Sequence, residues 1–132
     1  MDSEELFRMA LKVRENSYSP YSRFKVGAAL KLKGVETPIL GTNVENSSYG
    51  ATICAERSAI LAAIAQFGKV PFEALAVVAD CEPYVVPCAA CLGVIAEFCD
   101  PDFPIYCANL KGIQKVFKLK ELLPSPFRLE HS

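Results

Sequence analysis

The sequence has no apolar run approaching 18 residues, no excess of positive charge and only one histidine. Without such a run, no transmembrane helix is expected. The chain starts Met-Asp-Ser-Glu-Glu-Leu, which is acidic where a signal peptide is basic, so we expect a cytoplasmic protein with no membrane partner. A net charge of −1 argues against binding polymeric nucleic acid through its phosphates. The expected partner is a small molecule.

Internal repeats, linkers and low-complexity segments are also lacking. A chain of 132 residues that is 52% hydrophobic predicts one domain, 1–132, with an adequate core. Such an apolar chain does not need disulfides, although six cysteines are present. We expect Cys81, Cys99 and Cys107 to be free, mostly buried thiols. The single histidine, His131, is expected to be a tail group.

The other three cysteines lie in two short motifs. Cys54-Ala-Glu56 is followed about thirty residues later by Pro87-Cys88-Ala-Ala-Cys91. A structural zinc site is normally closed by four protein ligands, whereas three ligands leave one position for water or substrate. Three thiolates beside a carboxylate therefore predict a catalytic zinc held by Cys54, Cys88 and Cys91, one ion per chain, with Glu56 as the base.

Each motif stands at the predicted start of a helix. Helix-forming residues run from Cys54 to a stop at Gly68, and Pro87 favours a helix start just before Cys88. Helix N-termini lower the pKa of thiols and attract negative charge. We therefore expect two helix N-termini to converge and to hold all three cysteines as thiolates.

Three thiolates around Zn²⁺ carry a formal net charge of −1, which weakens the metal as a Lewis acid. Arg57 is the nearest cation in sequence that could compensate, by donating a hydrogen bond to a ligand sulfur. Alternatively, Arg57 is an ordinary surface or interface residue.

The periodicity of the sequence predicts an α/β protein. A first helix with Asp2 and Glu5 as a capping box should end near Asn16. Two strands, 26–33 and 38–42, should form a hairpin, a fully buried strand is expected at 74–79, and the last strands are expected at 104–108 and 114–117. With the two cysteine helices, the order α-β-β-α-β-α-β-β predicts a three-layer α/β/α sandwich around a mixed sheet of about five strands.

Four ordered blocks carry a resemblance to a known family. They are YSPYSRFKVGAAL at 18–30, GTNVEN at 41–46, TICAERSAI at 52–60 and LLPSPF at 122–127. Together with the cysteine motifs they resemble the small, homotetrameric, zinc-dependent cytidine deaminases. The resemblance implies hydrolysis of cytidine, and of 2′-deoxycytidine, to the uridine nucleoside and ammonia in pyrimidine salvage. Glu56 would act as the proton shuttle during attack of an activated water at ring C4.

The resemblance also implies the substrate-binding residues. Asn43 and Glu45 would bind the ribose, notably its 3′-hydroxyl, Phe24 would pack near the pyrimidine, and the backbone of Ala55 would bind the exocyclic amine. Phe127 would cover the base in the active site of a neighbouring subunit, so the homotetramer would have shared sites. Each has a plainer interpretation: a polar loop for Asn43 and Glu45, and packing residues for the two aromatics. Tyr49 could line the site or a subunit interface.

The chain departs from many relatives after the second cysteine motif. Where those have Pro-Cys-Gly-x-Cys-Arg-Gln, this chain has Ala89 and then Leu92-Gly93. An Arg-Gln pair that would give polar support near the metal is missing, although no ligand is changed.

Three other functions are compatible with the sequence. A deaminase of the same fold could act on another aminopyrimidine, such as blasticidin S. A structural zinc or iron-sulfur module would need a fourth thiolate, from Cys81 or Cys99. A catalytically dead relative could serve as a binding protein, given Leu92-Gly93.

Overall fold

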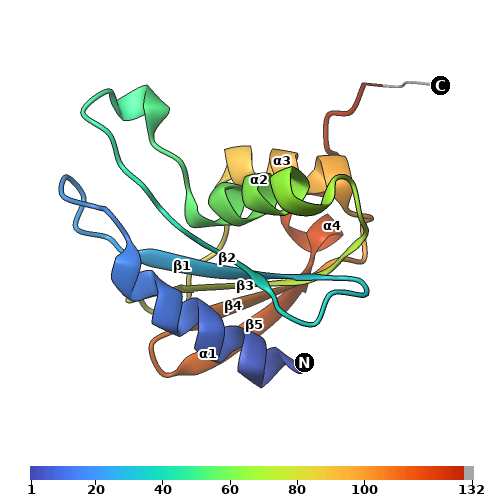
Figure 1. Cartoon of the computed structure of the whole chain (residues 1–132), viewed down its shortest axis with the longest axis horizontal. Coiled ribbons are helices and arrows are strands. Elements are labelled where there is room, and N and C mark those ends of the chain that lie inside the picture. The colour runs from blue at the N-terminus through green and yellow to red at the C-terminus, as the bar shows by residue number, and fades with distance from the viewer. Residues whose placement is uncertain (130–132) are drawn as a thin grey trace.

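A five-stranded mixed sheet forms the middle layer of the protein (Figure 1). The computed structural model describes residues 1–129, so His131 lies outside the described residues. The strand order is β2-β1-β3-β4-β5, and only the central pair β3–β4 is parallel. The strands are β1 (Val26–Leu32), β2 (Ile39–Thr42), β3 (Phe72–Ala79), β4 (Pro104–Asn109) and β5 (Gly112–Lys118).

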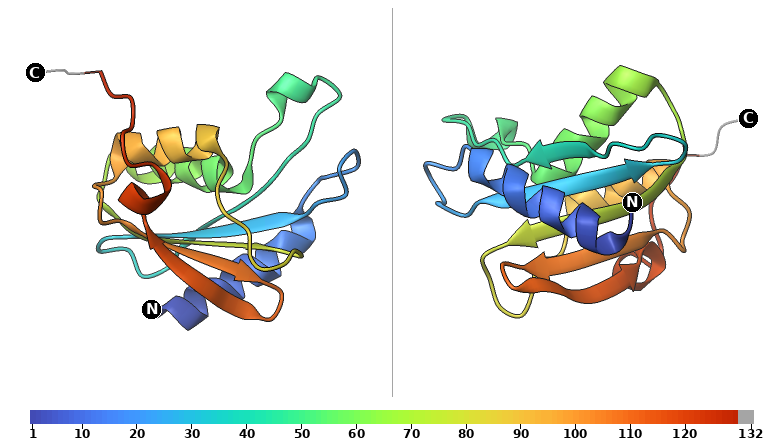
Figure 2. Two further views of the ribbon diagram at one scale, coloured as in Figure 1. Left: turned by 180° about the vertical axis from the view of Figure 1, so that it is seen from behind. Right: turned by 60° about the horizontal axis from the view of Figure 1, so that its bottom comes forward.

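Helices cover both faces of this sheet. Helix α1 (Ser3–Val13) lies on one face, and α2 (Ala55–Phe67) lies beside α3 (Ala89–Phe98) on the other (Figures 1 and 2). The predicted three-layer α/β/α sandwich and the order of its elements are confirmed. Short elements that the periodicity did not predict are α4 (Leu119–Leu122) and the 3-10 turns Arg14–Asn16 and Tyr49–Ala51. No helix among residues 1–129 is long and apolar enough to cross a membrane.

Local chemistry explains the first helix. The side chain of Asp2 caps α1 by accepting a hydrogen bond of 2.9 Å from the Glu5 amide, which is one of the two bonds of the predicted capping box. Leu6, Phe7 and Ala10 recur at helical spacing and are buried against the sheet.

The topology brings the starts of α2 and α3 to one edge of the sheet. Strands β2 and β3 are both antiparallel to β1, so they run in the same direction, and β4 is parallel to β3. Helix α2 connects β2 to β3, and α3 connects β3 to β4. Because a crossover helix begins where its preceding strand ends, both helices begin at the carboxyl edge of these strands. The predicted convergence of two helix N-termini therefore follows from the strand order.

Helix α2 packs on β2 at very short range. A Cβ atom placed on Gly41 would lie 2.5 Å from the carbonyl oxygen of Ala55 and 2.5 Å from the amide nitrogen of Ala59. Both atoms belong to the backbone and cannot rotate away. Glycine at this position therefore fixes how closely the first cysteine helix approaches the sheet.

We predict that Gly41→Ala destabilises the fold by about 1–3 kcal/mol, because the added methyl group forces α2 away from β2. Gly93→Ala is the matched control: nothing lies within 4 Å of its added Cβ, and alanine favours the helix by up to about 1 kcal/mol. Unfolding of both variants in urea measures the difference. Equal stability of Gly41→Ala and the wild type would contradict the close packing.

Candidate active site

Three cysteine sulfurs meet where α2 and α3 begin. Cys54 is the N-cap residue of α2, Cys88 is the N-cap residue of α3, and Cys91 lies in the first turn of α3. Neither N-cap side chain makes a capping hydrogen bond to the backbone of its own helix, which leaves both thiols able to turn toward the same point. The three Sγ atoms all lie within 4.8 Å of one another. The geometry therefore brings together the predicted ligand set.

The spacing of these sulfurs fits zinc. The Sγ atoms of Cys54 and Cys88 are 3.8 Å apart. Two sulfurs bonded to one zinc at about 2.3 Å, at the tetrahedral angle, are separated by about 3.8 Å. Among residues 1–129, the group of potential ligands contains no fourth cysteine, so Cys81 and Cys99 do not close the site. This weakens the alternative of a structural four-thiolate module.

Arg57 lies against the thiols, as the charge argument predicted. Its Nη2 donates a hydrogen bond of 3.4 Å to the Cys54 sulfur. Interaction with the Cys54 and Cys91 sulfurs raises the pKa of the Arg57 guanidinium further above its ordinary value. The Nε atom is buried without a partner in the described part of the chain, which leaves one more donor beside the sulfurs. The interpretation of Arg57 as an ordinary surface residue is therefore not favoured.

The pKa values of Cys54 and Cys91 are shifted in opposite directions. Hydrogen bonding from Cys91, followed by that from Arg57, lowers the pKa of Cys54 to about 5. The same interaction with Cys54 raises the pKa of Cys91, because its proton is held between the two sulfurs. The expected thiolate state of all three cysteines stays a prediction for the metal-bound protein. A metal would have to displace the remaining protons, so metal binding should release them.

Glu56 is buried beside this cluster. Glu56 is 4% exposed, and it is the second residue of α2, next to the predicted ligand Cys54. Desolvation, and then the negative charge at Cys54, raise the pKa of Glu56 to about 7. A carboxyl group with a pKa near neutrality can both accept and return a proton, which is the property expected of a general acid/base.

A short three-way backbone pairing joins the metal cluster to a second group of predicted residues. Val44 pairs with Ile53, the residue before the ligand Cys54, through hydrogen bonds of 2.9 and 3.0 Å. On its other side, the segment around Val44 pairs with Tyr18. The loop 17–25 and the segment 43–45 are therefore fixed relative to the start of α2.

Asn43, Glu45 and Phe24 gather in this second group. The Asn43 Nδ2 donates to the Phe24 carbonyl at 2.7 Å, and its Oδ1 accepts from the Val26 amide at 2.9 Å. The carboxylate of Glu45 accepts two backbone N–H bonds and a hydroxyl bond from loop 17–25. Both polar residues are buried, whereas Phe24 is 41% exposed.

Two serines of this group were not predicted to have roles. Ser17 donates to the Asn43 Oδ1, and Ser22 donates to a carboxylate oxygen of Glu45. The hydroxyl bond from Ser22 lowers the pKa of Glu45 below its ordinary value. Both serines stand in the block at 18–30 or directly before it, but serine is common in loops and has no spacing that marks such a role.

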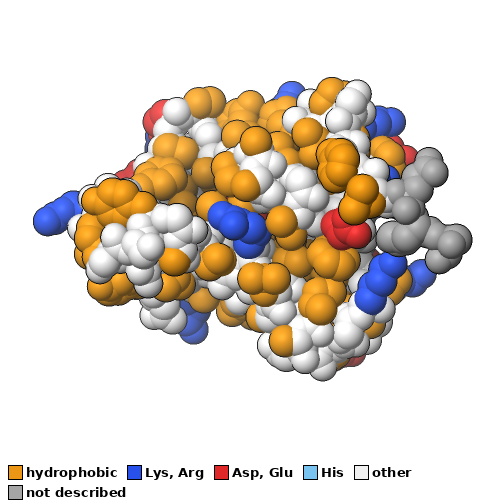
Figure 3. Space-filling model, turned by 90° about the horizontal axis from the view of Figure 1, so that it is seen from above, with side chains coloured by type: hydrophobic (Ala, Val, Ile, Leu, Met, Phe, Trp, Pro, Cys, Tyr) orange, Lys and Arg blue, Asp and Glu red, His pale blue; other side chains and the backbone are white. Residues whose placement is uncertain are grey.

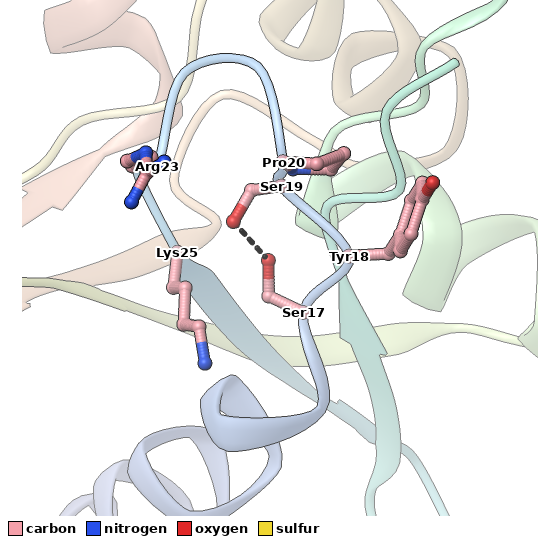
Figure 4. Close-up of a pocket in the computed structure, with 6 residues that line it drawn as sticks. All are labelled: Ser17, Tyr18, Ser19, Pro20, Arg23 and Lys25. Carbon is pink, nitrogen blue, oxygen red and sulfur yellow. Dashed lines mark hydrogen bonds between the residues drawn. The ribbon is translucent and has the colours of Figure 1, made fainter.

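Loop 17–25 also borders a surface pocket of about 470 Å³ (Figure 4). The hydroxyls of Ser17 and Ser19 face each other inside the loop at 3.2 Å, and Tyr18 points away from them. Arg23 and Lys25 lie across from the two serines. The internal serine bond holds the base of the loop together.

The remaining predicted residues, Ala55, Phe127 and Tyr49, differ from one another in burial. Ala55 is fully buried at the first position of α2, between the ligand and Glu56. Phe127 is 83% exposed, in a C-terminal segment that extends away from the helices (Figure 2). Tyr49 is 73% exposed and stacks edge-on against Tyr21, with ring centroids 5.6 Å apart. The single chain therefore gathers the predicted site residues into two groups, which are joined by the Val44–Ile53 pairing, and leaves Phe127 outside both.

Comparison with known proteins agrees with this geometry. The family model "Cytidine and deoxycytidylate deaminase zinc-binding region" matches residues 1–108. Relatives include the cytidine deaminase of Sporosarcina psychrophila, 49% identical over 98% of this chain and 94% of that protein. The cytidine deaminase of Halalkalibacterium halodurans is 46% identical over 98% of this chain and 97% of that protein. The crystal structure of cytidine deaminase from Burkholderia pseudomallei superposes with a TM-score of 0.90 at 40% identity, covering 96% of this chain and 100% of that one.

The sandwich with its cysteine cluster defines a zinc deaminase fold, and the chain belongs to the cytidine and deoxycytidylate deaminase family. Leu92 and Gly93, which stand where the resemblance implies an Arg-Gln pair, lie in different surroundings. Leu92 is buried and joins the hydrophobic core, and Gly93 faces open space. Apolar packing by Leu92 therefore anchors the start of α3 at a position where a polar pair was expected.

We predict that Cys88→Ala retains less than about a tenth of the wild-type zinc and melts at a lower temperature, because the free energy of metal binding is also folding free energy. Cys81→Ala is the matched control, since Cys81 lies outside the sulfur cluster. Elemental analysis of the purified proteins measures zinc per chain. Full zinc in Cys88→Ala would exclude this cysteine as a required ligand.

Proposed function

We propose that the protein is a zinc-dependent hydrolase that converts cytidine and 2′-deoxycytidine to the uridine nucleosides and ammonia. The observation that carries this proposal is the buried Glu56 next to three convergent cysteine sulfurs. Cys54, Cys88 and Cys91 would hold one zinc ion per chain, within a single domain spanning 1–132. Relatives named cytidine deaminase, which this chain matches almost end to end, support the substrate.

The chemistry is divided between the metal and Glu56. Zinc, when bound, supplies a Lewis acid that lowers the pKa of water. Glu56 would carry the two protons of the attacking water in turn, delivering the first to ring N3 and the second to the departing amine. Its pKa of about 7 suits these repeated exchanges. Arg57 would draw negative charge from the sulfurs, which keeps the metal a better Lewis acid.

The hydrogen-bonding capacity left on Asn43 and Glu45 matches one sugar hydroxyl. A carboxylate has about four acceptor positions, and three of those on Glu45 are filled by Tyr21 and Ser22. On Asn43, Val26 and Ser17 fill the Oδ1 positions and Phe24 takes one Nδ2 hydrogen. One acceptor and one donor remain. A hydroxyl group donates once and can accept, so a single hydroxyl, such as the 3′-hydroxyl, satisfies both.

The pyrimidine would lie between the two groups of residues. Phe24 is exposed enough to offer its ring to a base, and the backbone of Ala55 lies between the ligand Cys54 and Glu56. These positions are consistent with base packing by Phe24 and with recognition of the exocyclic amine by the Ala55 backbone.

We further propose that the enzyme is a homotetramer with shared active sites. The molecular face over α2 and α3 is rich in apolar side chains (Figure 3). Leu61, Phe67 and Phe127 are among the large apolar residues exposed on the chain. An exposed apolar surface of this kind is typical of subunit interfaces. The extended segment with Pro124 and Pro126 is stiff, which suits Phe127 to reach into a neighbour's site.

Glu56→Gln tests the catalytic assignment. We expect full zinc content, because Glu56 is not a ligand, and turnover of cytidine reduced by about 10² to 10⁴. Release of ammonia from cytidine and elemental analysis provide the two readouts. If the wild type deaminates cytidine and Glu56→Gln does so at the same rate, Glu56 is excluded as the proton shuttle.

Subunit mixing tests the shared site. Inactive Glu56→Gln chains refolded together with impaired Phe127→Ala chains should form some sites that contain an intact Glu56 and a neighbour's Phe127. Activity of the mixture should therefore exceed the average of the two parents. Leu129→Ala, which shortens another exposed side chain of the same segment, should not impair activity by itself. Hybrids whose activity only averages the parents would place Phe127 outside the neighbour's site.

A further inference from the structure

Both peptide groups that flank Phe24 are held by side chains of the sugar-binding group. The carbonyl of Phe24 accepts a hydrogen bond of 2.7 Å from Asn43. Its amide donates at 3.0 Å to the hydroxyl of Ser22, and that hydroxyl donates in turn to the Oε2 of Glu45. The position of the aromatic ring is thus linked to the two residues proposed to bind the sugar.

Ser22 is the centre of the link to Glu45. Its amide and that of Tyr21 donate to the Oε1 of Glu45, at 3.1 and 2.9 Å, while its hydroxyl donates to Oε2. Ser22 therefore contacts both carboxylate oxygens and leaves one acceptor position on Oε2. Alanine in place of Ser22 would lack this hydroxyl and would leave the Oε2 of Glu45 free to rotate away from its present orientation.

The backbone between Ser22 and Phe24 is strained, which shows that the loop is held by its contacts. Arg23 has φ 59, a left-handed conformation that side chains disfavour. Such a conformation persists only where the surroundings determine it, and it is often found at functional sites. The Arg23 amide donates to the Ser19 carbonyl at 2.9 Å, and the bonds of Ser22 and Asn43 hold the next residue.

We propose that Ser22 is a positioning residue that couples recognition of the sugar to placement of the base, by joining the Glu45 carboxylate to the Phe24 backbone. This inference rests on the proposed nucleoside deaminase function. Ser22 itself does not take part in the chemistry. The groups that it orients contact parts of the substrate that do not change during deamination, so its loss should weaken ground-state and transition-state binding equally.

Steady-state kinetics on the intact, zinc-loaded enzyme test this coupling. Ser22→Ala should raise KM for cytidine about tenfold and change kcat by less than about twofold, with zinc content unchanged. Ser22→Thr keeps the hydroxyl and should restore most of the loss. Ser48→Ala is the matched control, because the side chain of Ser48 makes no capping hydrogen bond in its own turn.

A double-mutant cycle identifies the partner through which Ser22 acts. In a Glu45→Ala background, Ser22→Ala should reduce kcat/KM by less than a further factor of about two, because the group that it orients is gone. If the loss of kcat/KM in the double variant equalled the product of the losses in the two single variants, the coupling would be overturned. Equal impairment of Ser22→Thr and Ser22→Ala would also overturn it, since the hydroxyl would then not be the group that matters.

Hydrogen exchange separates failure of this inference from failure of the proposed function. The amide of Phe24 should exchange faster in Ser22→Ala and return toward the wild-type rate in Ser22→Thr, whether or not cytidine is the substrate. Unchanged exchange in Ser22→Ala would overturn the role of Ser22. Faster exchange in a protein whose wild type does not deaminate cytidine would instead count against the proposed substrate.

Discussion

The arrangement of this site depends on the convergence of two helix N-termini at one edge of the sheet. Because β2, β3 and β4 run in the same direction, α2 and α3 must begin at the same edge, and both begin with a cysteine. The close contact of α2 with Gly41 then fixes its distance from the sheet. The positive ends of two helix dipoles and the Arg57 guanidinium favour negative charge on the sulfurs, whereas burial raises the pKa of Glu56.

A second constraint ties the substrate-binding loops to the metal cluster. The pairing of Val44 with Ile53 places the segment that is proposed to bind the sugar directly beside the residue that precedes Cys54. Most hydrogen bonds of the Asn43 and Glu45 side chains hold loop 17–25 in place. Their structural and binding roles are therefore not alternatives: the bonds that fix the loop also limit each residue to one remaining contact with a ligand.

Much of the fold and of the metal site could be predicted from the sequence, because these features have local signals. Helical periodicity, the glycine stop at Gly68 and the Cys-x-x-Cys spacing each report on neighbouring residues. The roles of Ser17 and Ser22 could not be predicted, because their partners lie more than twenty residues away in the sequence. The lowered pKa of Cys54 could not be predicted for the same reason, because its largest cause is Cys91, which lies on another helix.

The central claim is that three sulfurs, and not four, hold the metal. X-ray absorption at the zinc edge of the purified, zinc-loaded protein measures this most directly, because it counts the atoms bound to zinc and identifies their type. The account predicts three sulfur ligands at about 2.3 Å and one lighter atom, oxygen or nitrogen, at about 2.0 Å. Four sulfur ligands would close the site, leave no position for water and contradict a catalytic role for this cluster.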